Sequence, residues 1–353
     1  MIVLGIETSC DETAASVVQD GKKLLSNVVA SSMDLHAKYG GVVPEIAARS
    51  HIEAMMPAVV QALDDASVTW DDIDAIAVTQ GAGLGGSLLI GVLTARTLAI
   101  VNKKPLYGVN HVEGHLYANF LTETSLPGYD MPATQPQFPI LGIIVSGGHS
   151  QLVLFRNHFD YTLLGQTHDD AIGEAFDKVA KILGMPYPGG IEVSRLAEHG
   201  DAHKYRLPKA HMAGKYDFSF SGLKTAVLRL AQELVGKDYS LPSYELPSLL
   251  NDAQKADIAA SFQRIAVETI VDKALLAFEE FKPKSVIIGG GVAANGELRK
   301  QLAERLPLPI TYADRKLCTD NGAMIAALGS FKHQLGAEQA NPYTLAIKPN
   351  LSM

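Results

Sequence analysis

The sequence has few cysteines and no surplus of basic residues. Cys10 and Cys318 are the only two cysteines among 353 residues. Two cysteines provide no disulfide framework, so a reducing cytoplasm is the expected setting. Lysine and arginine number 30 against 38 aspartates and glutamates, which gives a net charge of −8. Because phosphate contacts need cationic side chains, this chain is expected to be a poor unaided ligand for nucleic acid.

The sequence also predicts neither a membrane span nor a signal peptide. We expect no apolar run as long as a membrane span. The first apolar residues, 1–6, lead directly to Glu7, Asp11 and Glu12, so no signal peptide is expected. What is present, 47% hydrophobic and 19% charged residues, is typical of a soluble globular protein. The length suits two domains of ordinary size.

A pair of histidines, His111 and His115, follows a short apolar strand. Histidines four positions apart on a helix share one face and can bind one metal ion. Glu113 lies two positions after His111, about 200° around the helix, so its carboxylate is expected to point away from such a metal. Peptidase chemistry with Glu113 as the base is therefore disfavoured. A structural role for the pair is the alternative.

Two turns of small or polar residues follow buried strands in the first part of the chain. Residues 7–13 form a polar hairpin tip whose acids and hydroxyls could order a phosphate, although a plain surface turn is the alternative. Residues 81–87 form a glycine turn between a strand and a helix. This turn is typical of phosphate sites, but close helix packing explains the glycines equally well.

The same order of elements occurs twice, which predicts two related lobes that face each other across a cleft. Strands are expected at 1–6, 13–19, 23–30 and 73–79 in the first half, and at 140–145, 151–155, 161–166, 284–288 and 309–312 in the second. Helices are expected at 44–63, 88–101, 116–121, 170–183, 253–281 and 323–335. We expect a linker at 122–138 and an irregular insertion at 199–250. The glycines at 289–291 favour a base or ribose against backbone, with Asn295 able to bond to it, and helix packing is the alternative.

Six runs resemble one family, the TsaD family of tRNA N6-adenosine threonylcarbamoyltransferases, formerly described as O-sialoglycoprotein endopeptidases. The runs are GIETSCDET at 5–13, HVEGH at 111–115, VSGGH at 145–149, GEAFDK at 173–178, FSFSGLK at 218–224 and CTDNGA at 318–323. The resemblance extends from residue 2 to about residue 332. It implies an α/β protein with the actin-like ATPase-domain (ASKHA) fold, two related lobes and a central cleft. We place the N-terminal lobe at 1–125, the C-terminal lobe at 139–335 with the insertion at 199–250, and a tail at 336–353.

The resemblance also implies the residues of a site. It makes His111, His115 and Asp320 ligands of one divalent metal, with Fe(II) favoured and Zn(II) as the alternative. The implied substrate-binding residues are Ile144, Val145, Ser146, Gly147, Gly148, Asp177, Gly190 and Asn295. Asp11, Glu12 and His149 are candidates for catalytic proton handling or substrate orientation. Because Asp320 would lie in the second lobe, the metal is expected to link the lobes.

The implied reaction transfers a threonylcarbamoyl group from threonylcarbamoyl-AMP to N6 of adenosine 37, in tRNAs that read codons beginning with A. The implied partners are tRNA, a paralogous actin-like subunit (TsaB-like) and a small ATPase (TsaE-like), in the cytoplasm and without a membrane. We expect the paralogous subunit to dock on helices 44–63 and 88–101, through Met55 or Met56. Two alternatives use the same fold: a phosphotransferase, and a chaperone-like nucleotide switch.

Overall fold

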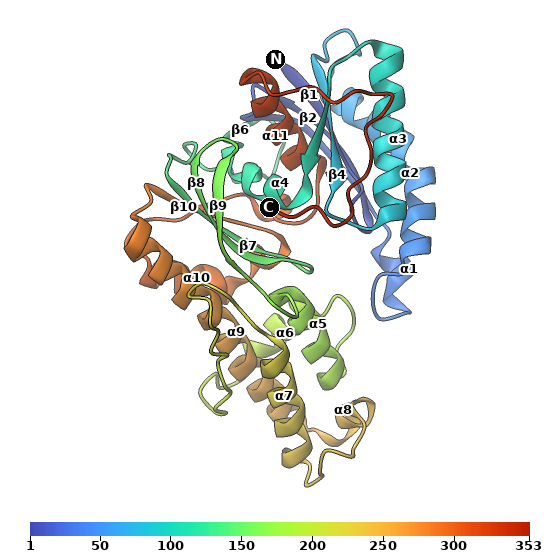
Figure 1. Cartoon of the computed structure of the whole chain (residues 1–353). Helices are drawn as coiled ribbons and strands as arrows, with labels where there is room; N and C mark the ends of the chain where they lie inside the picture. The colour runs from blue at the N-terminus through green and yellow to red at the C-terminus, as the bar shows by residue number, and fades with distance from the viewer. The chain divides into compact units, whose positions relative to one another are not determined.

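The computed structural model describes all residues, 1–353, and divides into two units (Figure 1). The first unit comprises residues 1–136 and 311–353, and the second comprises residues 137–310. Each unit is built around one mixed β-sheet.

The first unit has a six-stranded sheet in the order β5-β4-β1-β2-β3-β6. Its strands are β1 (Ile2–Glu7), β2 (Glu12–Gln19), β3 (Lys23–Ser31), β4 (Ala75–Gly81), β5 (Leu106–Asn110) and β6 (Glu123–Thr124). Strands β1, β2 and β3 form an antiparallel meander in which Ile2 pairs with Gln19 and Glu7 with Ala14. Strand β4 runs parallel to β1 on its other side. The acidic tip at 7–13 therefore joins the first two strands, as expected.

Helices cover both faces of this sheet. They are α1 (Met33–Ala37), α2 (Pro44–Asp65), α3 (Gly85–Asn102), α4 (His111–Tyr117) and α11 (Gly322–Gln334), with short 3-10 turns at Ala118–Phe120 and Arg315–Leu317. Helix α2 packs on β2 and β3 and α3 packs on β4, whereas α11 contacts β1, β2, β4 and β5 (Figure 1). The approach of α11 is very close, because a Cβ on Gly5 would lie 2.4 Å from the amide nitrogen of Ala326.

The expected boundary of the C-terminal lobe is wrong at its far end. Residues 311–353 belong to the first unit because α11 packs on its sheet and the tail runs along it. Of the expected linker at 122–138, residues 122–136 also belong to the first unit. They contain β6, and the amide of Asp130 donates to Asp314.

The second unit repeats the meander, which confirms the internal repeat. Strands β7 (Ile140–Val145), β8 (Ser150–Asn157) and β9 (Asp160–Gln166) are antiparallel, and β10 (Ser285–Gly289) runs parallel to β7. The sheet order is β11-β10-β7-β8-β9, and at β11 (Thr311–Tyr312) the chain returns to the first unit. The helices are α5 (Ile172–Leu183), α6 (Gly189–Ala197), α7 (Ser221–Leu234), α8 (Leu246–Leu249), α9 (Asp252–Phe281) and α10 (Gly296–Arg305), with 3-10 turns at Ser243–Glu245 and Gly291–Ala294.

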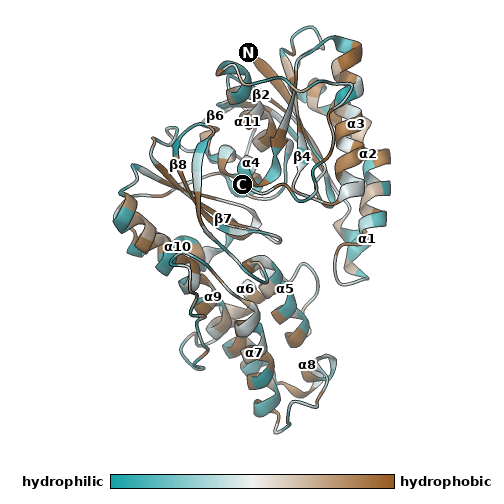
Figure 2. Ribbon diagram, in the orientation of Figure 1, coloured by the Kyte–Doolittle hydropathy of each residue, from teal (hydrophilic) through white to brown (hydrophobic).

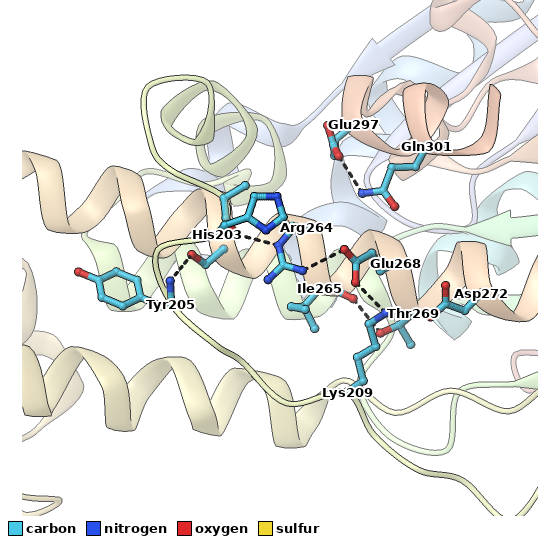
Figure 3. A network of polar contacts seen from close by, with 12 residues as sticks. His203, Tyr205, Lys209, Arg264, Ile265, Glu268, Thr269, Asp272, Glu297 and Gln301 are labelled. Carbon is cyan, nitrogen blue, oxygen red and sulfur yellow. Dashed lines mark hydrogen bonds and ion pairs between the residues drawn. The ribbon is translucent and has the colours of Figure 1, made fainter. Parts of the chain in front are cut away.

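The insertion at 199–250 is more regular than expected, because it contains α7 and α8. Its first part is held on α9 by ion pairs (Figure 3). Nζ of Lys209 lies 2.7 Å from Glu268 and 2.8 Å from Asp272, and Arg264 lies 3.0 Å from Glu268. These half-buried pairs fix the segment that precedes α7.

Helix α3 corrects the expectation that no apolar run is long enough to span a membrane. It is long and apolar enough by length and composition, although that alone is weak evidence. One face of α3 is buried on β4 and α2, through Leu88, Val92, Ala95 and Ala99. Figure 2 shows hydrophobic colour along α2 and α3 as well as along the strands. Some of the hydrophobic side chains on these two helices are exposed: Ile52, Met56 and Val60 on α2, and Leu89 and Leu93 on α3.

Candidate active site

The two histidines lie in the short helix α4, which begins where β5 ends. Asn110 is the N-cap, and its Oδ1 accepts a hydrogen bond from the amide of Val112 at 2.9 Å. All seven residues of α4 are buried. The rings of His111 and His115 lie on the same face, with centroids 4.6 Å apart. The spacing therefore produces the paired arrangement that the sequence predicts.

Asp320 completes a cluster with these histidines. It lies just before α11, whose N-cap is Asn321. Its Oδ1 is 3.5 Å from Nε2 of His111 and 3.3 Å from Nε2 of His115. The three ligand atoms lie within 4.8 Å of one another. All three residues belong to the first unit, so the expectation that the metal links two lobes is wrong.

Glu7, at the end of β1, contacts the other side of His111. Its Oε2 lies 3.0 Å from Nδ1 of His111, and the amide of Ser9 and the hydroxyl of Thr79 also donate to this carboxylate. Burial alone lowers the pKa of His111, but Asp320 and Glu7 outweigh it and raise that pKa to about 9. Burial raises the pKa of Glu7, but His111 outweighs it and lowers that pKa overall. The pocket thus favours positive charge between two carboxylates.

His115 shows most directly that the cluster fits a metal ion. It is 1% exposed, and neither ring nitrogen has a hydrogen-bond partner. A buried polar atom without a partner costs free energy, so its presence calls for a ligand. Two imidazoles and one carboxylate are donors that suit Fe(II) or Zn(II). The residues present therefore fit the implied divalent metal.

Glu113 stands apart from this cluster, as its position on the helix predicts. It is not among the residues whose ligand atoms converge. Burial raises its pKa to about 7, and the charge that opposes this shift is Lys332. Glu113 therefore belongs to the packing between α4 and α11.

The acidic turn with Asp11 and Glu12 also belongs to the first unit. Burial, followed by the charges of Asp320 and Asp11, raises the pKa of Glu12 to about 9. Buried side chains hold the backbone of this turn. His51 Nε2 lies 3.0 Å from the carbonyl of Cys10, and the hydroxyl of Ser32 donates to the carbonyl of Asp11 at 2.8 Å. Electrostatics therefore connects this turn with the metal cluster.

The turn after β7 in the second unit leaves space around two glycines. A Cβ on Gly147 or Gly148 would meet no atom within 4 Å, and neither amide donates a hydrogen bond within the protein. The turn is closed by Ser146, whose amide donates to the carbonyl of His149 at 2.8 Å. Ile144 and Val145 are fully buried strand residues, so only their backbone can face a ligand.

Asp177 on α5 lies beside the start of α6. Its Oδ1 accepts from the amide of Gly189 at 2.8 Å, and burial raises its pKa although the amides of Gly189 and Gly190 oppose the shift. The side chain of Asn295, in contrast, already makes hydrogen bonds within the protein. Its Oδ1 caps α10, while its Nδ2 donates to Ser194 at 2.8 Å and to Gln263 at 2.9 Å. Both hydrogens of its side-chain amide are therefore donated within the protein.

Two features near the site were missed or left open by sequence reasoning. The contact of Glu7 with His111 was missed, although an acid at the end of an apolar strand could have indicated it. The glycine turn after β4 holds protein rather than phosphate. The amide of Gly83 donates to the carbonyl of Pro349 at 3.0 Å, and that of Leu84 to Ser9 at 2.8 Å. These contacts favour the packing alternative there.

Comparison with known proteins identifies the family. The family model TsaD, tRNA N6-adenosine threonylcarbamoyltransferase, matches residues 23–327. Relatives with that name in Thermomicrobium roseum and Symbiobacterium thermophilum are 50% and 49% identical, over 95% of this chain and 93% and 92% of theirs.

Solved structures confirm the actin-like ATPase fold. (R)-2-hydroxyglutaryl-CoA dehydratase component A of Acidaminococcus fermentans matches with a TM-score of 0.50 at 19% identity, covering 95% of this chain and 99% of that one. Full-length HypF, in its phosphate- and nucleotide-bound form, matches with a TM-score of 0.55 at 13% identity, covering 94% of this chain and 55% of that one. By the match to the family model and the relatives that are about half identical, the chain belongs to the TsaD family of tRNA N6-adenosine threonylcarbamoyltransferases.

Proposed function

We propose that the chain transfers a threonylcarbamoyl group from threonylcarbamoyl-AMP to N6 of adenosine 37, in tRNAs that read codons beginning with A. We further propose that His111, His115 and Asp320 hold one divalent metal, with Fe(II) favoured over Zn(II). The observation that carries the proposed metal site is the burial of His115 without a hydrogen-bond partner. Its side chain is 1% exposed and its Nε2 lies 3.3 Å from Asp320.

Around the metal, residues of the first unit orient the metal ligands and the substrate. His111, His115 and Asp320 would hold the divalent ion, which would supply Lewis-acid polarisation of a substrate oxygen. Glu7 fixes the orientation of His111, because its contact with Nδ1 leaves Nε2 facing Asp320. Asp11 and Glu12 orient the substrate from the neighbouring turn, where burial and then the charges of Asp320 and Asp11 raise the pKa of Glu12.

In the second unit, the proposed groups bind the nucleotide part of the substrate. The amides of Gly147 and Gly148 are suited to phosphate and carbamoyl oxygens, because they are open and unpaired. His149 follows them in the same turn and is the candidate for proton handling there. Asp177 accepts from Gly189 through Oδ1, and its carboxylate beside Gly190 is the proposed acceptor for a ribose hydroxyl. Asn295 shapes this region through Ser194 and Gln263 rather than by contact with the base.

We propose that the chain works with partners in the cytoplasm. With a net charge of −8, its affinity for tRNA is expected to come partly from other proteins. The expected partners are a paralogous actin-like (TsaB-like) subunit and a small (TsaE-like) ATPase. The exposed apolar residues of α2 and α3 offer a docking surface for the first of these. Met56 is 46% exposed whereas Met55 is buried, so Met56 is the relevant methionine.

The test is reconstitution with tRNA transcript, threonylcarbamoyl-AMP and the partner proteins. The modified nucleoside is measured by mass spectrometry before chelation, after chelation, and after return of Fe(II) or Zn(II). We expect chelation to abolish its formation and one ion to restore it. Full activity of metal-free protein would contradict the metal's role. Phosphorylation of a sugar without modified nucleoside would favour the phosphotransferase alternative.

A further inference from the structure

The last eighteen residues, 336–353, follow α11 as an extended segment along the first unit, which we call the C-terminal strap (Figure 1). Exposure alternates along it: Leu345, Ile347, Pro349 and Leu351 are partly buried, whereas the residues between them are exposed. Leu345 and Ile347 pack against the hydrophobic core beside β1 and β4. The strap is therefore bound to the unit by one of its faces.

A single arginine holds the middle of the strap. Nε of Arg96 on α3 donates to the carbonyl of Pro342 at 2.6 Å, and its two terminal nitrogens donate to the carbonyls of Tyr343 and Leu345. The amide of Ala340 also donates to Leu106 of β5 at 2.8 Å. None of these contacts involves residues 348–353.

The final six residues contact the backbone around His111 by two routes. In the first, the amide of Lys348 donates to the carbonyl of Gln80 at 2.6 Å, and the carbonyl of Pro349 accepts from Gly83 at 3.0 Å. Gly83 also lies against Ser9. Oγ of Ser9 is 3.1 Å from Nδ1 of His111. The fit is close, since a Cβ on Gly81 would overlap the carbonyl of Lys348.

The second route is through the cap of α4. Nδ2 of Asn110 donates to the carbonyl of Ser352 at 3.1 Å, while Oδ1 of the same side chain caps α4. A seven-residue helix is too short to be stable on its own, so it depends strongly on its cap and its packing. The carbonyl of Ser352 is therefore hydrogen-bonded to the side chain of Asn110, which caps the helix that carries both histidines.

We propose that the C-terminal strap is a positioning element of the metal centre, and that Asn110 is the positioning residue through which its end acts. This inference rests on the proposed metal site. Both routes use backbone groups of the strap, so its path matters more than its exposed side chains. The strap acts on His111 in the same way as an outer hydrogen-bond partner of a metal ligand.

The test compares the full chain with a variant that ends after Ile347. This truncation keeps the contacts of Arg96 and the packing of Leu345, and removes only the final six residues. We expect loss of the bound metal to a chelator to become about 10-fold faster, the lower end of the range for outer-shell changes. The Co(II)-substituted protein should show an altered visible absorption spectrum. Ser352→Ala, which keeps the carbonyl, is the matched control and should behave as the full chain.

Asn110→Asp tests the same link in a chain of full length. Aspartate keeps the acceptor that caps α4 but loses the donor to Ser352. We expect faster metal loss, and no further acceleration when Asn110→Asp is combined with the truncation, because the truncation already removes the contact of Asn110 with Ser352. Lower thermal stability with an unchanged Co(II) spectrum and metal-loss rate would show a merely structural role and overturn the proposal.

Hydrogen exchange of residues 111–117 in the metal-free protein separates this inference from the proposed function. We expect faster exchange in the truncated chain than in the full chain and in Ser352→Ala. If the full chain binds no metal, the proposed metal site fails, and the exchange result still decides whether the strap supports α4. Equal exchange rates in all three proteins would overturn the inference.

Discussion

Nδ1 of His111 lies 3.0 Å from Oε2 of Glu7, and Nε2 of the same ring faces Asp320 at 3.5 Å. The side chain of Glu7 is fully buried and Asp320 is one-fifth exposed, so the imidazole lies between an inner and an outer carboxylate. The inner carboxylate selects the ring nitrogen that faces the ligand cluster.

Glu7→Gln is therefore expected to weaken metal binding without unfolding the chain. Glutamine keeps the shape of the side chain but loses the charge that favours the metal-binding orientation of His111. We expect metal affinity to fall by about 10–100-fold, measured by competition with a chelator. Glu123→Gln, which removes an exposed ion pair with Lys22, is the control and should have no effect. Unchanged affinity in Glu7→Gln would show that Glu7 serves only packing.

Asp177→Ala tests the nucleotide side of the proposal. Loss of a hydrogen bond to a charged group should weaken binding of a non-hydrolysable adenylate analogue by about 1.5–3 kcal/mol, measured by calorimetry. Metal content should not change. Because Asp177 also accepts from Gly189, the comparison includes Asp177→Asn, which keeps an acceptor there. Glu174→Ala on the same helix is the control. Metal loss with normal nucleotide affinity would assign Asp177 a different role.

The exposed residues of α2 and α3 are expected to bind the paralogous subunit. Ile52→Glu, Met56→Glu and Leu93→Glu each place a charge on an apolar side chain that is 63%, 46% and 44% exposed, respectively. We expect each to abolish co-elution in size-exclusion chromatography while the melting temperature stays within a few degrees. Leu276→Glu, at an exposed apolar site on α9, should leave association intact. Normal association in all three variants would exclude this surface.

His158 makes the stability of the chain depend on pH. Burial lowers its pKa from the ordinary 6.5 to about 4. Between these values the unfolded chain binds a proton that the folded chain does not, so stability falls as pH decreases from 6.5 to about 4. Above pH 6.5 this contribution is fully present. In urea unfolding, His158→Gln should lose less stability over that interval than the original chain. Parallel pH profiles would contradict the shift.

Local pattern was enough to predict the repeated meanders and the histidine pair. The strands of both meanders alternate with short turns, and the spacing of His111 and His115 depends only on helix geometry. The return of residues 311–353 to the first unit could not be predicted, because it depends on the close contact of α11 with Gly5. The engagement of Asn295 likewise depends on Ser194 and Gln263, which are distant in sequence.

His111, His115 and Asp320 are proposed to hold one metal ion, and metal analysis of single variants tests this proposal. His111→Ala, His115→Ala and Asp320→Ala should each lose most of the bound metal and most of the transfer activity. Glu113→Gln and Glu113→Ala should keep the metal, because Glu113 lies outside the cluster. We predict a metal content well below that of the original chain in Asp320→Ala and a normal content in both Glu113 variants. Normal metal content in Asp320→Ala, or metal loss in the Glu113 variants alone, would contradict the account.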